Sequence, residues 1–174
     1  MSGKGGGSNE LDQIYRRYAE GLYYYLLHLS GSPSLSEELV QETFYRAKIS
    51  LARFKHQEVK PWLYKIARNT YIDEWRRRKR WKWVPFFERK EMVSPYGIPE
   101  VEMVNKENIQ ELEEILQLLP ENYRTIIYLR EYEGFSYEDI QEAMDLSEGQ
   151  VKITLFRARK RMKELGERWR GEKT

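Results

Sequence analysis

The sequence predicts an all-α fold with two small helical domains joined by an irregular linker. Every regular segment has apolar residues three or four positions apart, as on one face of a helix, and none alternates as a strand does. One stretch, WVPFFERKEMVSPYGIPE, has three prolines and a glycine and no helical period, which is typical of a linker. We therefore expect a flexible tail (1–8), a first domain (9–81), a linker (82–105) and a second domain (106–174).

Two helices are expected at the start of the first domain. Residues 10–29 place leucines and tyrosines at helical spacings, and the SGSPS segment (30–34) breaks this pattern. We expect Ser34 to cap the second helix, with Glu37 as its capping-box partner. An apolar stripe and an opposite polar face then divide this helix. The stripe consists of Val40, Phe44, Ala47 and Leu51, and the polar face of Glu38, Gln41, Glu42 and Tyr45. Either exposure to water or docking of a basic partner helix explains the polar face.

Residues 60–82 predict a helix with a basic front. They hold nine basic residues and two acidic ones, and Pro61 suits a first helical position. Steps of about 100° per residue place Leu63, Ile66, Ala67 and Thr70 in one narrow buried stripe. They place Lys65, Arg68, Asn69, Ile72, Arg76 and Lys79 opposite, with aromatic residues along the flanks. Such a face can hold phosphates and stack on unpaired bases. A solvated basic face on an ordinary core helix is the alternative.

The second domain is expected to begin with two helices. Asn105 can cap the first of them, and Pro120 opens the second, which stops near Gly134. The residues expected to face inward are Ile109, Leu112, Leu116 and Leu119 in the first, and Tyr123, Ile126, Ile127 and Arg130 in the second.

Two further helices form a helix-turn-helix pattern, in which the second is longer and basic. Ser136 caps the first, with Ile140, Ala143 and Met144 inward, and a turn follows at Asp145 and Leu146. Ser147 caps the second, with Gln150 as its capping-box partner. Val151, Leu155, Ala158 and Met162 face inward, and Gly149, Lys152, Ile153, Phe156 and Lys160 face outward beside Gln150, Arg157 and Arg159. The outward apolar pair suits either thymine methyl groups or a protein interface. A generic helix hairpin is the alternative for the whole region.

Although the net charge is only +2, acidic and basic residues are unevenly distributed along the chain. An acidic block separates two basic stretches. Residues 100–150 hold fourteen acidic and three basic residues, whereas residues 151–170 hold eight basic and two acidic ones. Two basic stretches suggest two contacts with a polyanion. No cysteine is present, which excludes disulfides and thiolate metal sites, and no metal or other cofactor is expected. No apolar run is long enough to span a membrane, and the glycine-rich start resembles neither a signal peptide nor a phosphate loop.

Three blocks, in order, resemble the extracytoplasmic-function (ECF) sigma factors of bacterial RNA polymerase. EELVQETFYRAK resembles the segment that docks on the clamp helices of the polymerase β′ subunit. KPWLYKIARNTYIDEWRRRKR resembles the segments that open and read the minus-ten promoter element. LPENYRTIIYLREYEGFSYEDIQEAMDLSEGQVKITLFRARKRM resembles the helix-turn-helix region that reads the minus-thirty-five element.

The resemblance implies a role for each set of residues. Glu38, Gln41, Glu42 and Tyr45 would contact the polymerase. His56, Gln57, Lys60, Trp62, Lys65, Arg68, Asn69, Arg76 and Arg77 would act at the minus-ten element, where the loop before the basic helix holds a flipped base. Gln150, Lys152, Ile153, Phe156, Arg157 and Lys160 would act at the minus-thirty-five element. The chain departs from the family at Asp145, where glycine is common, and at Ile153-Thr154, where Ser-Arg is common.

The expected function is therefore promoter recognition and melting by a sigma factor, and not catalysis. The implied partners are promoter DNA, core polymerase (β′ clamp helices and β flap) and a membrane-linked anti-sigma factor. The expected location is the cytoplasm. Two alternatives remain. One is a nucleic-acid enzyme, although His28 and His56 are the only histidines and neither an HExxH motif nor a phosphate loop appears. The other is a stand-alone helix-turn-helix regulator. It would explain residues 119–162, but it leaves the basic helix and the acidic face without a task.

Overall fold

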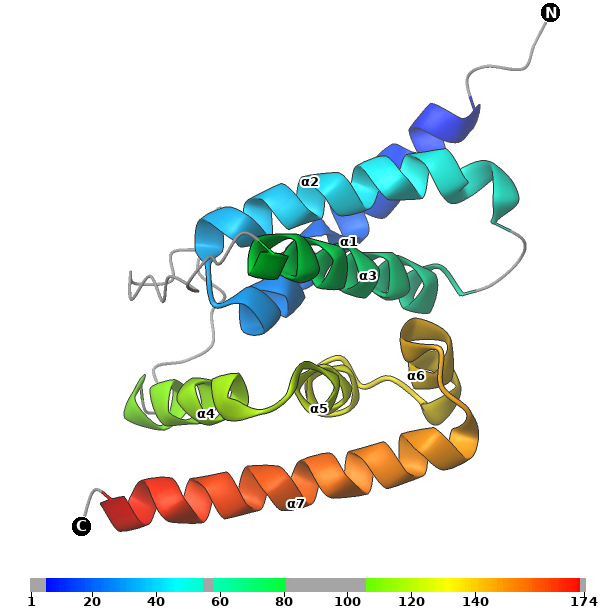
Figure 1. The fold of residues 1–174 in the computed structure, drawn as a ribbon. Coiled ribbons are helices and arrows are strands. Elements are labelled where there is room, and N and C mark those ends of the chain that lie inside the picture. Colours follow the sequence, from blue (N-terminus) through cyan, green and yellow to red (C-terminus); the bar gives the residue numbers. More distant parts are fainter. Residues whose placement is uncertain (1–5, 55–57, 81–105, 173–174) are drawn as a thin grey trace, which may run out of the picture. The chain divides into compact units, whose positions relative to one another are not determined.

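The computed structural model describes residues 6–54, 58–80 and 106–172, and all regular structure in these ranges is helical (Figure 1). The chain divides into two compact units, Met1–Arg89 and Lys90–Thr174. The predicted all-α fold with two helical domains is thus confirmed. The expected linker, residues 82–105, lies outside the described ranges.

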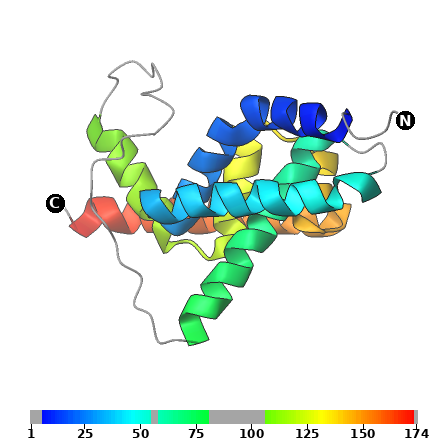
Figure 2. The same cartoon turned by 90° about the horizontal axis from the view of Figure 1, so that it is seen from above.

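The first unit contains three long helices, each of which contacts the other two. They are α1 (Gly6–Ser30), α2 (Pro33–Ser50) and α3 (Val59–Arg80), and a short 3-10 turn, η1 (Leu51–Arg53), follows α2. Leucines and tyrosines of α1 meet the apolar stripes of α2 and α3, so that Leu26, Ala47 and Leu63 are fully buried. Figure 2 shows the C-terminal half of α3 running past the other two helices. That half is the part of α3 that remains open to a ligand.

The helix α2 begins two residues earlier than expected. Ser32, not Ser34, is the N-cap: its hydroxyl accepts a hydrogen bond from the Leu35 amide at 3.3 Å, and Pro33 occupies the first helical position. Proline is favoured there because it has no amide hydrogen to satisfy. The predicted capping box between Ser34 and Glu37 was therefore wrong. Val40, Phe44 and Ala47 of the predicted stripe are buried. Leu51, its fourth predicted member, lies beyond the end of α2 in η1 and is only partly buried.

The buried side of α3 is wider than the predicted narrow stripe. Leu63, Ala67 and Thr70 are buried as expected, but Trp62, Tyr64 and Tyr71 are at most 9% exposed as well. The Tyr64 ring packs against Tyr25 with centroids 5.2 Å apart, and the Trp62 ring packs against Phe54 at 4.5 Å. The expectation that these three rings lie along exposed flanks was wrong, because α3 packs against both α1 and α2 and so buries more than one stripe.

The second unit is organised by its last helix. It comprises α4 (Lys106–Leu118), α5 (Glu121–Ile127), the π-helical turn η2 (Tyr128–Tyr132), α6 (Tyr137–Met144) and α7 (Glu148–Glu172). The long α7 contacts α4, α5 and α6, as Figure 1 shows. Its inward residues Val151, Leu155 and Ala158 are buried as predicted. The expected cap Asn105 lies outside the described residues.

A π-helical turn continues α5, and the sequence pattern does not predict it. The amide of Glu133 donates to the Tyr128 carbonyl, five residues back, at 3.1 Å. Arg130, expected to point inward, is partly buried, and its guanidinium donates to the Phe135 carbonyl at 2.7 Å. The arginine therefore closes the loop between η2 and α6.

The turn between α6 and α7 depends on a left-handed residue. Asp145 has φ 56° and ψ 49°, and its amide donates to the Gln141 carbonyl. Glycine adopts this conformation without strain, whereas aspartate is one of the few other residues that tolerate it. The structure thus accommodates the departure from glycine at this position without altering the helix-turn-helix.

Candidate nucleic-acid interface and docking faces

The polar face of α2 is exposed to solvent. All four of its predicted members, Glu38, Gln41, Glu42 and Tyr45, are exposed, and Tyr45 is 61% exposed. They follow one another at helical spacing opposite the buried stripe. The result is an acidic surface with an amide and an exposed ring, which suits a basic helix of a partner. We call it the α2 polar face.

Arg46 connects this face to α3. Its Nε donates to Glu42 at 2.9 Å, and its Nη1 donates to Asp73 of α3 at 2.7 Å. These hydrogen bonds raise the pKa of Arg46, with the Asp73 bond as the largest cause. A charged group of a partner that binds Glu42 is therefore linked to α3 through a single side chain, that of Arg46.

The predicted minus-ten residues do not all reach the surface. Asn69, Arg76 and Arg77 are exposed, Lys60, Lys65 and Arg68 are partly buried, and Trp62 is buried. His56 and Gln57 lie outside the described residues. Among the described aromatic side chains of α3, Trp75 stands out at 50% exposed, and the Lys79 ammonium lies 4.9 Å from its ring centroid. The open part of the α3 basic face is thus its C-terminal half, residues 69–80.

Glu74 holds two of the arginines in this half. Both oxygens of its carboxylate accept hydrogen bonds from Arg77, at 2.7 and 2.9 Å, and one of them also accepts from Arg78 at 2.6 Å. The Arg77 guanidinium lowers the pKa of Glu74, and Arg78 adds to the effect. The number of cations on the helix therefore overstates the charge available to a phosphate, because Glu74 neutralises part of it.

A groove of about 340 Å³ joins the two surfaces. Glu38 and Glu42 of the α2 polar face line one side, and Asp73, Glu74 and Arg77 of α3 line the other. Sequence reasoning missed Arg46, Asp73 and Glu74 as site residues. The four-residue spacing of Glu42 and Arg46, and of Glu74 and Arg78, was the available signal.

The start of α7 is fixed by the predicted capping box. The Ser147 amide donates to the Gln150 side-chain oxygen at 2.8 Å, and the Gln150 amide donates to the Ser147 hydroxyl at 3.2 Å. Gln150 therefore uses its carbonyl oxygen for the cap and retains its amide hydrogens for other contacts. Lys152 forms an ion pair with Glu148 one turn earlier, which raises the pKa of the lysine.

The outer face of α7 combines apolar and basic side chains. Ile153 and Phe156 are 53% and 69% exposed, and Arg157 and Lys160 are exposed beside them. Within the described residues, neither Arg157 nor Lys160 forms an ion pair. A Cβ atom at Gly149 would meet no atom within 4 Å, so the fold of the unit itself does not require a glycine there.

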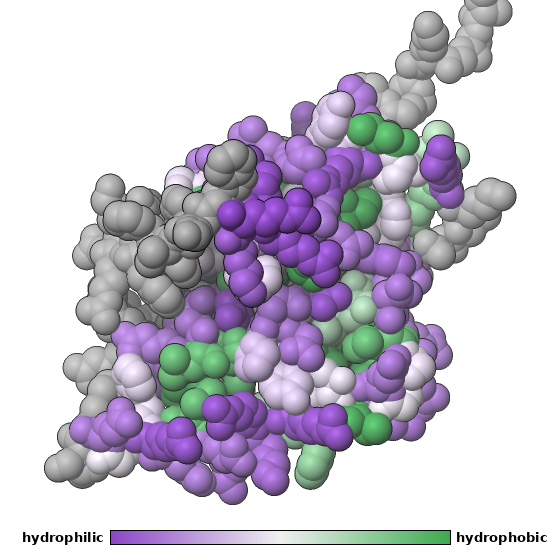
Figure 3. Space-filling model, in the orientation of Figure 1, coloured by the Kyte–Doolittle hydropathy of each residue, from purple (hydrophilic) through white to green (hydrophobic). Residues whose placement is uncertain are grey.

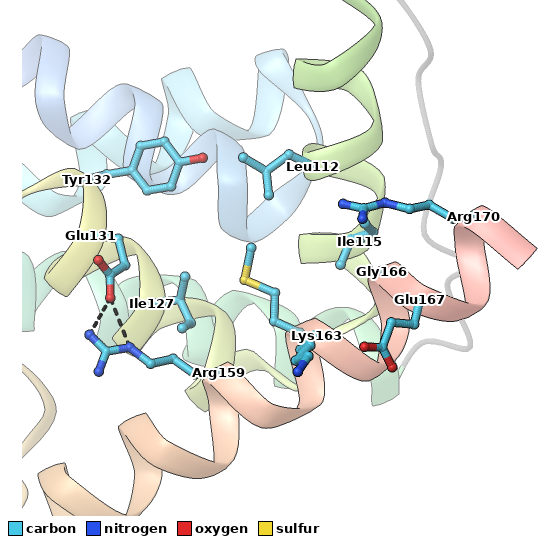
Figure 4. A pocket seen from close by; sticks show the side chains of 11 residues that line it. Leu112, Ile115, Ile127, Glu131, Tyr132, Arg159, Lys163, Gly166, Glu167 and Arg170 are labelled. Atoms are coloured by element: carbon cyan, nitrogen blue, oxygen red, sulfur yellow. Dashed lines mark hydrogen bonds and ion pairs between the residues drawn. The ribbon is translucent and has the colours of Figure 1, made fainter.

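A second groove, of about 620 Å³, lies between α4, η2 and α7. Leu112, Ile115 and Ile127 supply apolar walls, and Glu131 is held on the rim by two hydrogen bonds from Arg159, the shorter at 2.5 Å (Figure 4). Figure 3 shows the corresponding hydrophobic patch over α4 and α7 on a surface that is otherwise mostly hydrophilic. Helical periodicity does not predict this groove, because its walls come from four elements, α4, α5, η2 and α7.

None of the described helices has a stretch long and apolar enough to cross a membrane. No three His, Cys, Asp or Glu side chains in the described ranges are grouped so that they could hold a metal ion.

Comparison with protein families matches both units, in order. The model of Sigma-70 region 2 matches residues 14–81, and that of Sigma-70 region 4 matches residues 109–162. The ECF RNA polymerase sigma factor SigM of Bacillus subtilis is 35% identical over 164 residues, covering 89% of this chain and 94% of that protein. RNA polymerase sigma factor YlaC of the same organism is 29% identical over 157 residues, covering 89% of this chain and 91% of that protein.

Two solved structures are also similar to this chain. The sigma factor RpoE of Bartonella quintana, in complex with the anti-sigma factor NepR, superposes with a TM-score of 0.72 at 27% identity. That match covers 90% of this chain and 96% of RpoE. CnrH, in complex with the cytosolic domain of CnrY, superposes with a TM-score of 0.66 at 20% identity over 92% of this chain and 89% of CnrH, and shares the fold.

Proposed function

The chain belongs to the ECF family of RNA polymerase sigma factors, and from this premise we propose how its surfaces direct bacterial polymerase to promoters. The observation that carries the proposal is the pairing of one acidic and two basic faces on two separate helical units. The acidic α2 polar face docks on the polymerase. The α3 basic face holds the minus-ten element, and the outer face of α7 enters the major groove at the minus-thirty-five element.

At the minus-ten element, α3 holds one DNA strand as the duplex opens. Asn69, Arg76 and Arg77 contact the backbone, and the exposed Trp75 ring offers a stacking surface. Unstacking a base costs a few kcal/mol, and stacking on an aromatic ring returns about 1–3 kcal/mol per base. One exposed ring with a partly neutralised cationic face therefore falls short of melting DNA without help. Core polymerase supplies the remainder, so the free protein opens no promoter.

Docking on the polymerase uses the charge of the α2 polar face. Glu38 and Glu42 complement basic residues of the β′ clamp helices, and Tyr45 packs against their apolar stems. The groove between α4, η2 and α7 is where the β flap docks, because its walls are apolar and its rim carries charges of both signs. Two separate docking surfaces would allow each unit to be positioned on its own promoter element.

An anti-sigma factor controls the protein in this proposal. The support is the RpoE relative, which is 27% identical and was solved in complex with the anti-sigma factor NepR. The partner would cover the same α2 polar face that the polymerase needs, so that the two compete. We place the complex in the cytoplasm, with the anti-sigma factor linked to the membrane.

Sigma factors initiate transcription and do not themselves catalyse RNA synthesis, and we assign this chain no reaction of its own. The rival interpretation, a stand-alone helix-turn-helix regulator, accounts for α6 and α7 only. It provides no role for the acidic face of α2 or for the exposed half of α3.

Run-off transcription with core polymerase on a randomised promoter library tests the proposal. We expect transcripts only when this chain is added, from templates that share two sequence elements. A stable dimer that binds a palindrome without polymerase, with no stimulated transcription, would favour the regulator instead.

A further inference from the structure

Two large apolar side chains lie on the outer face of α7, where its own unit does not cover them. Ile153 and Phe156 are 53% and 69% exposed, whereas Val151 and Leu155, which alternate with them, are buried. The two are three residues apart, so they lie side by side on one helical face. Both side chains are therefore available for contact with a ligand that binds this face.

The surroundings of the pair identify the class of ligand. Lys152, Arg157 and Lys160 are exposed around it, and Glu148, the one acidic residue between positions 148 and 160, is paired with Lys152. Two apolar side chains within a cationic rim match a polyanion that carries small apolar groups, rather than an extended apolar protein surface. Gly149 on the same face leaves room for a close approach of that ligand.

We propose that Ile153 and Phe156 read the 5-methyl groups of thymines on neighbouring base pairs of the minus-thirty-five element. This inference rests on the proposed function, which places α7 in the major groove. The thymine methyl is the apolar group that a base pair presents there, and isoleucine and phenylalanine side chains can bury it. Three helical residues span about 4.5 Å, close to the roughly 3.4 Å between successive base pairs, so each side chain faces its own step.

The assignment also accounts for the chain's departure from its family. The recognition helix carries Ile153 and Thr154 where Ser-Arg is common, and Thr154 is partly buried. An arginine reads guanine through two hydrogen bonds, which neither residue can reproduce. Ile153 itself stands where serine is common and places an apolar side chain on the outer face, which favours a methyl-bearing base there.

The experiment uses the full chain with core polymerase on a promoter selected from the randomised library. Each thymine of the upstream element is replaced in turn by deoxyuridine, which removes only the methyl group and keeps base pairing. We expect promoter affinity to fall about fourfold at the thymine that faces Ile153, from the methyl lost from an apolar contact. The variant Ile153→Ser should bind the thymine and deoxyuridine promoters equally. The matched control Lys160→Ala should weaken binding to every sequence alike and keep the methyl effect.

The outcomes separate this inference from the function on which it rests. Normal promoter complexes that are indifferent to every upstream methyl group, or a selected element without thymine, would overturn methyl reading and leave the sigma function intact. Protection of Ile153 and Phe156 by a protein partner, with no change on DNA binding, would also overturn it. Absence of any promoter-specific complex would remove the proposed function itself.

Discussion

Arg46 of α2 donates a hydrogen bond from Nη1 to the Asp73 carboxylate of α3 at 2.7 Å, and its Nε donates to Glu42 at the same time. The arginine therefore joins a residue proposed to dock on the polymerase to the helix proposed to hold DNA. Because all three side chains are partly exposed, each contact is worth about 0.2–1 kcal/mol in isolation. Its importance lies in geometry, since displacement of Glu42 by a partner's cation leaves Arg46 with Asp73 alone.

Reversing the charge of Glu42 should disrupt docking. We expect Glu42→Arg to weaken binding to core polymerase at least tenfold, because it introduces repulsion at a face that meets basic residues. Folding should change little, since the side chain is exposed. Binding is measured by titration of labelled protein with core polymerase. The matched control is Glu20→Arg on α1, which makes the same charge change at another exposed site. Equal affinity of the two variants would argue against the α2 polar face.

Neutralising Glu74 should release two arginines for DNA. We expect Glu74→Gln to tighten binding of the free protein to single-stranded DNA several-fold and to steepen its salt dependence by about one phosphate contact for each freed cation. Asp73→Asn is the control, because it removes the same charge at the adjacent position but frees Arg46 instead. An equal gain from both variants would point to net charge rather than to the Glu74 carboxylate.

The same carboxylate makes stability depend on pH in a defined direction. The pKa of Glu74 is lowered from 4.5 by its arginine partners, so its contribution is complete above about pH 4.5 and is lost as pH falls through the lowered value. The difference in urea stability between the wild type and Glu74→Gln should therefore be present at pH 7 and shrink as the pH falls below about 4.5. A difference that persists at the acidic end would mean that the carboxylate stabilises the unit by packing rather than by charge.

Trp75 should matter for opening and not for docking. We expect Trp75→Ala to reduce open-complex formation by about fivefold or more, which corresponds to the loss of about 1–3 kcal/mol of stacking. Trp75→Phe should retain most of the activity, since it keeps an aromatic face. Permanganate reactivity of minus-ten thymines measures opening, and polymerase affinity serves as the internal control. Unchanged opening in the alanine variant would remove Trp75 from the proposed mechanism.

The stability of the second unit should depend on which side chain occupies position 145. Alanine lacks the local hydrogen bonding that lets aspartate adopt φ 56°, so Asp145→Ala should destabilise the second unit by about 1 kcal/mol. Asp145→Gly should cost less or stabilise, because glycine enters the left-handed region without a Cβ clash. Thermal unfolding of the two variants tests the order, and greater stability of the alanine variant would contradict it.

Periodicity in the sequence predicted the helices and their order because each apolar stripe reports one local face. The Ser147–Gln150 capping box was equally local and was predicted correctly. Periodicity does not report how many neighbours cover a helix, and Tyr64 and Tyr71 were therefore placed on flanks instead of in the core. Periodicity also does not report which charged side chains pair with one another. The spacing of Glu74 did not require its carboxylate to bind both Arg77 and Arg78.

Helical periodicity predicted less of the candidate site than of the fold. Exposure of the α2 polar face and of the outer face of α7 followed from helical geometry. The two grooves did not, because the walls of each come from more than one helix, as with Leu112 of α4 and Met162 of α7. The functional role of each exposed residue came from family resemblance, and the experiments above are what test it.

The π-helical turn η2 has a consequence for comparing this chain with its relatives. A π turn holds one more residue than the regular helix that would replace it. A relative with a one-residue deletion within 128–132 could close this turn into a regular helix and keep the following side chains in phase. The change would be local to the turn that carries Glu131 and its hydrogen bonds with Arg159. A single-residue gap in an alignment of this segment therefore marks relatives whose groove presents a different rim.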